Sequence, residues 1–128
     1  MLAEACGKGG NFTEGLAVLA RALTAVEETG NHIYEPEMYR LQGEFLLALD
    51  PDTPAEAEAC FRQGVAISRR QQAKSLELRA TMSLARHWQR QGRRDEARTA
   101  LTAVYGTYTE GFTTPDLVDA AALLNSLA

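Results

Sequence analysis

The sequence predicts an all-α fold in which antiparallel helix hairpins stack side by side and a single helix caps the last of them. Three observations lead to this prediction. Apolar residues recur at helical spacing along the chain, a pattern of small and large apolar residues returns about every forty residues, and helix start and stop signals separate the periodic segments. Because no segment of useful length alternates with a period of two, we expect no strands.

The repeated pattern places one small residue on each side of a turn between two helices. The three pairs of small residues are Ala3 with Gly15, Gly43 with Ala57, and Ala85 with Ala97. Gly15, Ala57 and Ala97, the second members of these pairs, are separated by 42 and 40 residues in the sequence. Small side chains at such positions let two helices approach closely across a turn. The repeat therefore predicts three hairpins, over residues 1–29, 35–71 and 75–108, within a single domain of residues 1–128.

The first hairpin is expected to contain helices over residues 1–8 and 13–29. Asn11 stands three residues before Glu14, which is the spacing of an N-terminal cap and its reciprocal glutamate. The apolar stripe of the second helix is Leu16, Leu19, Leu23 and Val26. Gly30 is expected to end this helix, because glycine readily adopts the left-handed conformation that follows a helix C-terminus.

The second hairpin is expected to contain helices over residues 35–49 and 54–71. The apolar stripe of its first helix is Met38, Leu41, Phe45 and Leu49. The second helix opens with Thr53-Pro54-Ala55-Glu56, a capping box with proline at the first helical position. Phe61 is expected to fill the groove between the two helices.

The third hairpin is expected over residues 75–91 and 94–108, and the capping helix over residues 115–127. Their apolar stripes are Leu78, Met82, Ala85 and Trp88, then Leu101, Val104, Tyr105 and Tyr108, and last Leu117, Ala121, Leu124 and Leu127. Gly92 is expected to end the first of these helices, and Thr114-Pro115 to open the last.

The composition is that of a soluble globular protein, with 45% hydrophobic and 23% charged residues. The chain has no apolar run near the ~18 residues that cross a bilayer, and no signal-peptide pattern. We therefore expect a cytoplasmic location and no membrane contact. The net charge of −4 argues against nucleic-acid binding. Cys6 and Cys60 fall on apolar helical positions, where small buried side chains are expected rather than a disulfide.

The third hairpin also carries a recognisable motif. Its residues are Leu84-Ala85-x-x-Trp88, Gly92, Ala97 and Leu101. This pattern resembles the tetratricopeptide repeat (TPR), and the resemblance covers essentially residues 1–108. It implies that the helix pairs stack into a right-handed solenoid that binds other proteins. The chain departs from that family in its longer period and lacks the proline that usually closes each repeat.

A narrower resemblance involves three short stretches, at residues 39–44, 57–63 and 111–117. They are similar to the C-terminal repeat region of large bacterial adenylate or guanylate cyclase-like proteins and transcriptional-regulator ATPases. The resemblance implies a parent protein with cyclase or ATPase activity in other domains, since no such motif occurs in this sequence. Only about eight residues precede the first turn, too few for a full repeat helix. We therefore expect that the chain is a fragment that lacks upstream repeats.

No pattern of catalytic, cofactor-binding or metal-binding residues emerges. His32 and His87 lack further ligands at metal-binding spacing, and both are expected to be surface or half-buried residues. The glycine-rich residues 7–11 lack the strand and the Gly-Lys-Ser/Thr ending of a phosphate loop. The paired carboxylates are expected to favour helix N-termini and solvation. We therefore expect no enzyme activity and no cofactor.

The positive charge is concentrated between residues 62 and 98. Arg79, Arg86 and Arg90 stand at i, i+7 and i+11, which places them on one face of a helix. In a TPR-like solenoid this face would line the concave surface, and Tyr39 is a further candidate there. One interpretation is helix capping and solvation. The other is a cationic surface for an acidic peptide, a phosphorylated partner or a neighbouring domain.

Together these observations predict a non-catalytic protein–protein interaction or regulatory module of a multidomain signalling protein. The expected partner is a protein or peptide of acidic character, or a neighbouring domain of the same chain. Two alternatives stay open: a structural module that forms a homodimer through an exposed end of the solenoid, and a small-ligand sensor in the concave groove.

Overall fold

The computed structural model describes residues 12–52, 54–111 and 113–128, and this part of the chain contains six helices and no strand. The helices are α2 (Phe12–Thr29), α3 (Glu35–Leu49), α4 (Ala55–Gln71), α5 (Lys74–Arg90), α6 (Arg94–Tyr105) and α7 (Pro115–Leu127). The predicted all-α class is confirmed, and each helix expected within the described residues is present. The helix expected over residues 1–8 lies outside them.

Helix termini differ from the prediction in detail. Helix α6 ends at Tyr105, because Gly106 and Thr107 form a tighter turn in which the Thr107 amide bonds the Val104 carbonyl at 3.1 Å. Thr114 has the extended backbone of an N-cap, but its side chain makes no capping hydrogen bond. Pro54 occupies the N-cap of α4, and Thr53, the predicted cap, lies outside the described residues. The two predicted glycine stops are confirmed by positive φ angles of 73° at Gly30 and 79° at Gly92.

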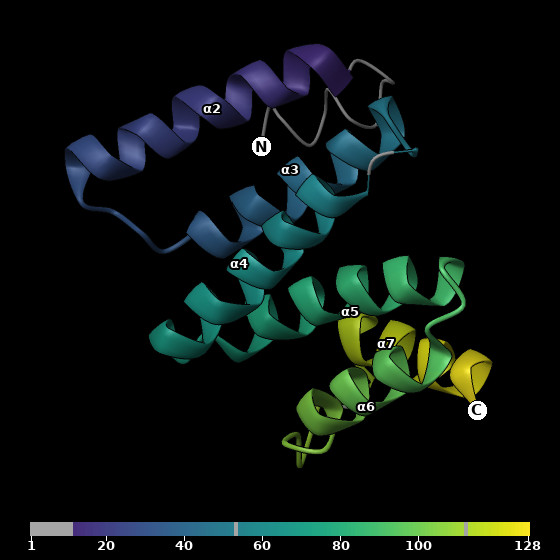
Figure 1. The fold of residues 1–128 in the computed structure, drawn as a ribbon. Helices are drawn as coiled ribbons and strands as arrows, with labels where there is room; N and C mark the ends of the chain where they lie inside the picture. Colours follow the sequence, from purple (N-terminus) through teal and green to yellow (C-terminus); the bar gives the residue numbers. More distant parts are fainter. Residues whose placement is uncertain (1–11, 53, 112) are drawn as a thin grey trace.

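Helices α3, α5 and α7 lie side by side and run in the same direction (Figure 1). Arg79 bonds Glu37 near the start of α3, and Arg40, further along α3, reaches Ser83, further along α5. These pairs are 42 and 43 residues apart, close to the spacing of the sequence repeat. Two bonds link α5 to α7 in the same way: Arg79 to Asp116 and Gln89 to Ser126, each over 37 residues.

Helices α2, α4 and α6 run in the opposite direction, each packed against the neighbours it follows or precedes in the chain (Figure 1). Helix α2 covers α3 at one end of the stack, where Leu19, Leu41 and Phe45 form a small apolar cluster. A larger cluster fills the space between α4, α5, α6 and α7. Within the described residues, successive helices therefore alternate between the α3–α5–α7 side and the opposite side.

The close approach of α3 and α4 depends on glycine. A Cβ atom added to Gly43 would lie 2.6 Å from Cε1 of the buried Phe61 ring. One added to Gly64 would lie 3.0 Å from the carbonyl oxygen of Pro36. Gly43, a small-residue position of the sequence repeat, therefore lies where these two helices cross, and Phe61 fills the space beside it.

Several residues of the predicted apolar stripes are not fully buried. Leu49, at the end of α3, is 47% exposed, because none of the described helices covers that position. Helix α7 buries Leu117, Ala120, Leu123 and Leu127, whereas the predicted Ala121 and Leu124 are only half-buried. The contact face of α7 is thus rotated by about one residue from the predicted stripe. Cys60 is a free, half-buried thiol, and Cys6 lies outside the described residues.

Candidate partner-binding surface

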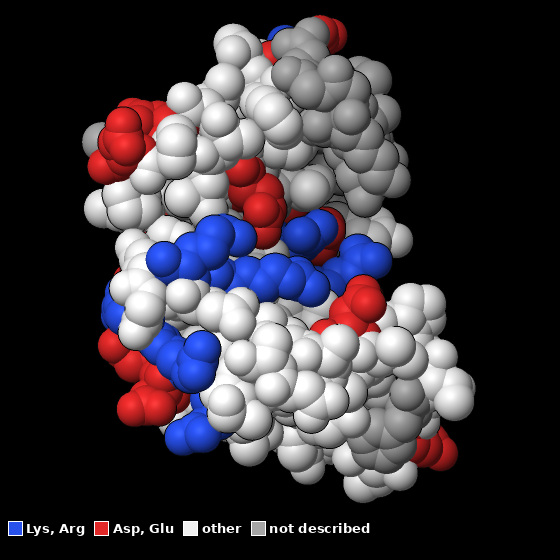
Figure 2. Space-filling view, turned by 90° about the vertical axis from the view of Figure 1, so that its right-hand side faces the viewer, with Lys and Arg blue, Asp and Glu red and all other residues white. Residues whose placement is uncertain are grey.

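One face of the molecule carries many basic side chains. Figure 2 shows Lys and Arg side chains in a band across the middle of the face where the C-terminal ends of α3 and α5 lie. Arg79, Arg86 and Arg90 stand on one side of α5 because their spacing follows the helical period. We call these three residues the α5 arginine row.

The first member of the row is engaged in the fold. Arg79 donates from Nε to Asp116 Oδ2 at 3.2 Å and from Nη1 to Glu37 Oε1 at 3.4 Å. The same Glu37 oxygen also accepts hydrogen bonds from Arg40, from Nε at 3.0 Å and from Nη2. The Glu37 carboxylate is buried, so two guanidinium groups compensate for the loss of its hydration. Arg79 therefore holds α3, α5 and α7 together.

The other two members of the row have free charge. Arg86 is half-buried and Arg90 is exposed, and neither forms an ion pair with any residue that the structure describes. Guanidinium groups in this state can form paired hydrogen bonds with a carboxylate or phosphate. The capacity of the row to bind an anion therefore resides in Arg86 and Arg90.

Tyr39 lies elsewhere. Burial raises the pKa of its phenol, and the nearby charges of Glu35, Cys60 and Glu27 raise it further. Cys60 belongs to α4 and Glu27 to α2, so Tyr39 faces those two helices. It stands two residues after Glu37, which turns it to the far side of α3 from the arginine row. The structure thus brings together three of the four predicted site residues.

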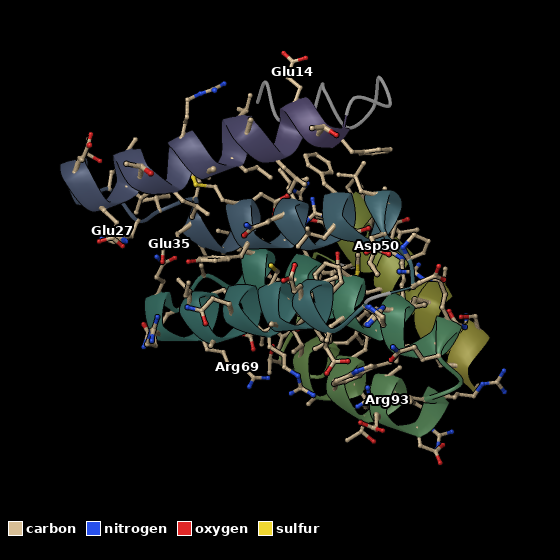
Figure 3. The ribbon with its side chains drawn as sticks, turned by 45° about the horizontal axis from the view of Figure 1, so that its top comes forward. Glu14, Glu27, Glu35, Asp50, Arg69 and Arg93 are labelled. Atoms are coloured by element: carbon tan, nitrogen blue, oxygen red, sulfur yellow. The ribbon has the colours of Figure 1, made fainter. Side chains whose placement is uncertain are left out.

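An open groove of about 490 Å³ lies beside the last arginine of the row. Its lining residues are Glu44, Leu47, Ala48, Pro51, Pro54, His87, Arg90 and Gln91. They come from the C-terminal half of α3, from the segment between α3 and α4, from the last turns of α5, and from Gln91, which follows α5. Figure 3 shows Asp50 at the end of α3 and Arg93 just beyond α5, at the same end of the molecule. We call this space the α3–α5 groove.

His87 lines the groove but is almost wholly buried, with only 2% of its surface exposed. The prediction of a surface or half-buried histidine was wrong, because this side of α5 is covered by α3 and α4. Its Nε2 atom lies 3.7 Å from Glu58 Oε1 and has no hydrogen-bond partner among the described residues. Burial lowers the pKa of His87; the carboxylates of Glu58 and Glu44 oppose this shift, and the Arg90 and Arg93 charges add to it.

Glu58, on α4, links this helix to α5 and to the N-cap residue of α6, and the sequence analysis did not single it out. It accepts hydrogen bonds from Trp88 Nε1 at 3.1 Å, Arg93 Nη1 at 3.0 Å and Arg62 Nε at 3.1 Å. The guanidinium groups of Arg62 and Arg93 also lie over the Trp88 ring, 5.2 and 5.0 Å from its centroid. The spacing of Glu58 and Arg62 at i and i+4 was the one available sequence signal. Much of the basic stretch is thus neutralised within the fold.

Stability should depend on pH through His87. Its pKa in the folded chain lies below the value of about 6.5 in an unfolded chain, so the unfolded chain takes up the proton first. The free energy of unfolding is therefore highest when the pH is above the pKa of the unfolded chain, and it decreases as the pH falls below that value. We expect the free energy of unfolding, measured with urea, to decrease between about pH 7.5 and pH 5.5, a window above the titration of ordinary carboxylates.

One variant tests this assignment. His87→Gln should flatten the pH dependence within that window. If His87→Gln kept the full slope, another group would have to be responsible.

None of the helices in the described part of the chain combines the length and apolar character needed to cross a bilayer. In the same part of the chain, no three His, Cys, Asp or Glu side chains are grouped so that they could hold a metal ion.

Comparison with known proteins gives no family assignment. No protein-family model matches this chain, and neither a curated protein nor a solved structure matches it. The resemblance to tetratricopeptide repeats, drawn from sequence motifs, therefore stays a prediction, and so do the functions that it implies.

Proposed function

We propose that the chain is a non-catalytic protein-interaction module of a cytoplasmic signalling protein, and that its α3–α5–α7 side binds an acidic segment. The segment belongs to a partner protein or to a neighbouring domain of the same chain. The observation that carries this proposal is the pair of cations at the end of the α5 arginine row, Arg86 and Arg90, which have no ion-pair partner within the described residues.

The architecture supports the same proposal. In a stack of TPR-like hairpins, every second helix lines one continuous surface on which a peptide can lie. Helices α3, α5 and α7 run in the same direction, and side-chain hydrogen bonds join residues of these helices at nearly the spacing of the repeat. We also propose that the hairpins form a TPR-like solenoid and that α7 is its capping helix. The groove beside Arg90 provides an apolar margin for side chains that flank the acidic residues.

A binding experiment tests this function. The probe is a short fluorescein-labelled peptide rich in aspartate and glutamate, titrated at low ionic strength and followed by fluorescence anisotropy. Replacing both cations (Arg86→Gln with Arg90→Gln) should weaken binding about tenfold, because two charge contacts at the protein surface, of roughly 0.5–1 kcal/mol each, are lost. Added salt should weaken binding to the wild-type chain more than binding to the double variant.

The matched control removes two charges elsewhere. Arg21 on α2 and Arg70 at the end of α4 are exposed and unpaired within the described residues. Arg21→Gln with Arg70→Gln changes the net charge by the same amount and should retain wild-type affinity. Equal losses in the two double variants would mean that the peptide responds to net charge and not to this surface. That result would contradict the proposal.

A further inference from the structure

The α3–α5 groove has a mixed lining that an anion-binding surface alone does not require. One part is apolar and comes from Leu47, Ala48, Pro51 and Pro54. The other part is polar and comes from Glu44, His87, Arg90 and Gln91. A volume of about 490 Å³ lies within the range of ordinary small-ligand sites, roughly 300–1,000 Å³, and such sites combine apolar walls with a few polar groups.

The groove contains one negative and one positive side chain that do not pair with each other. Glu44 and Arg90 both line it, yet no nitrogen–oxygen distance between them is within 4.0 Å. Neither has another ion-pair partner among the described residues. A bound molecule with a cationic group and an anionic group could therefore contact both.

His87 lines the groove as part of its wall. The side chain is 2% exposed, and its Nε2 atom, 3.7 Å from Glu58 Oε1, is itself buried and has no hydrogen bond in the described part of the chain. The ring therefore offers contact surface to a ligand. The groove then has a balanced pair of charges, one from Glu44 and one from Arg90.

This balance selects among simple ligands. A ligand with only a carboxylate would be attracted by Arg90 but repelled by the carboxylate of Glu44. A ligand with only an ammonium group would be attracted by Glu44 but repelled by Arg90. A zwitterion satisfies both, and an apolar substituent between its charged groups can cover Leu47, Pro51 and Pro54.

We propose that the α3–α5 groove binds a free α-amino acid with an apolar side chain, its carboxylate on Arg90 and Gln91 and its ammonium group on Glu44. The site goes beyond the proposed protein-interaction function and does not rest on it. Because Arg90 also ends the α5 arginine row, an amino acid in the groove competes with an acidic segment for this residue. The two ligands are therefore expected to exclude each other in part.

The test uses the chain itself and four defined probes. L-leucine and L-phenylalanine are titrated and followed by ¹H–¹⁵N NMR, with the His87 ring and the Gln91 amide as reporters. N-acetyl-leucine, which lacks the positive charge, and leucinamide, which lacks the negative charge, serve as ligand controls. We expect saturable shifts with the two zwitterions, and affinities for the two derivatives that are lower by about tenfold or more.

Charge-neutralising variants assign the contacts. Glu44→Gln and Arg90→Gln should each weaken zwitterion binding by about tenfold, because each leaves one charge of the ligand unpaired. Glu56→Gln on α4 and Arg21→Gln on α2 make the same changes at exposed positions outside the groove and should have no effect. Absence of saturable shifts at millimolar amino acid, or equal binding of N-acetyl-leucine, would overturn the proposal.

Glu44→Gln also separates this inference from the proposed function. Removing that carboxylate should weaken amino-acid binding but leave acidic-peptide binding unchanged or stronger, since it removes a repulsive charge beside Arg90. If both ligands lost affinity in this variant, the zwitterion assignment would be wrong, because a structural disturbance of the groove would explain both losses.

Discussion

Replacing Phe61 with alanine is expected to lower the free energy of unfolding by about 3–5 kcal/mol. The Phe61 side chain is 0% exposed and belongs to the main apolar cluster. Its ring lies against Gly43, where α3 crosses α4, and its centroid is 6.0 Å from that of the His87 ring on α5. The substitution leaves a cavity where three helices meet, and rigid helix backbones cannot close it completely.

Urea unfolding followed by circular dichroism measures this loss. Tyr34→Ala is the matched control, because it removes a large aromatic side chain that is 62% exposed and should change stability by less than about 0.5 kcal/mol. Phe61→Leu, which retains most of the apolar volume, should fall between the control and Phe61→Ala. A Phe61→Ala variant as stable as the control would show that the α3–α4 crossing does not depend on this ring.

The helices could be predicted from sequence because each has a local cause. The stripe of Leu78, Met82, Ala85 and Trp88 needs only the helical period, and all four residues are buried. Gly30 and Gly92 are confirmed as helix stops by their positive φ angles. Their role could be predicted because glycine, which has no Cβ atom, adopts this conformation without strain. The small residue Gly43 could be recognised from the repeat, although the atoms that it faces come from distant positions.

Features that depend on neighbouring helices could not be predicted. The burial of His87 follows from the coverage of α5 by α3 and α4, and nothing in its local sequence indicates that coverage. The exposure of Leu49 has the opposite cause, because the apolar stripe of α3 continues beyond the part of α3 that the other described helices cover. The rotated face of α7 depends on how that helix meets α5 and α6.

The candidate site divides in the same way. The alignment of Arg79, Arg86 and Arg90 could be predicted from their spacing on one helix. The engagement of Arg79 with Glu37 and Asp116 could not, because those carboxylates come from helices that lie beside α5 only in the folded chain. Sequence reasoning therefore found the positive charges but not which of them remain available to a ligand.

A second large effect is expected where α5 crosses α6. Ala97 is 0% exposed, as is Ala85 on the facing helix, and the two residues are the small pair of the third predicted hairpin. Ala97→Leu adds three carbon atoms to a site that has no space for them. We expect it to lower the free energy of unfolding by about 3 kcal/mol, at the upper end of the usual cost of overpacking.

Ala103→Leu is the matched control, because it makes the same change at an exposed position of the same helix and has the same effect on intrinsic helix propensity. The difference between the two urea midpoints, converted with their measured m-values, therefore isolates the packing contribution. Equal stability of the two variants would mean that α5 and α6 can separate at this crossing without loss. The small residues of the repeat would then have another cause than close helix approach. A difference near the expected size would identify the alanine pair as a stabilising contact, and the corresponding Gly43–Ala57 pair would be the next crossing to test.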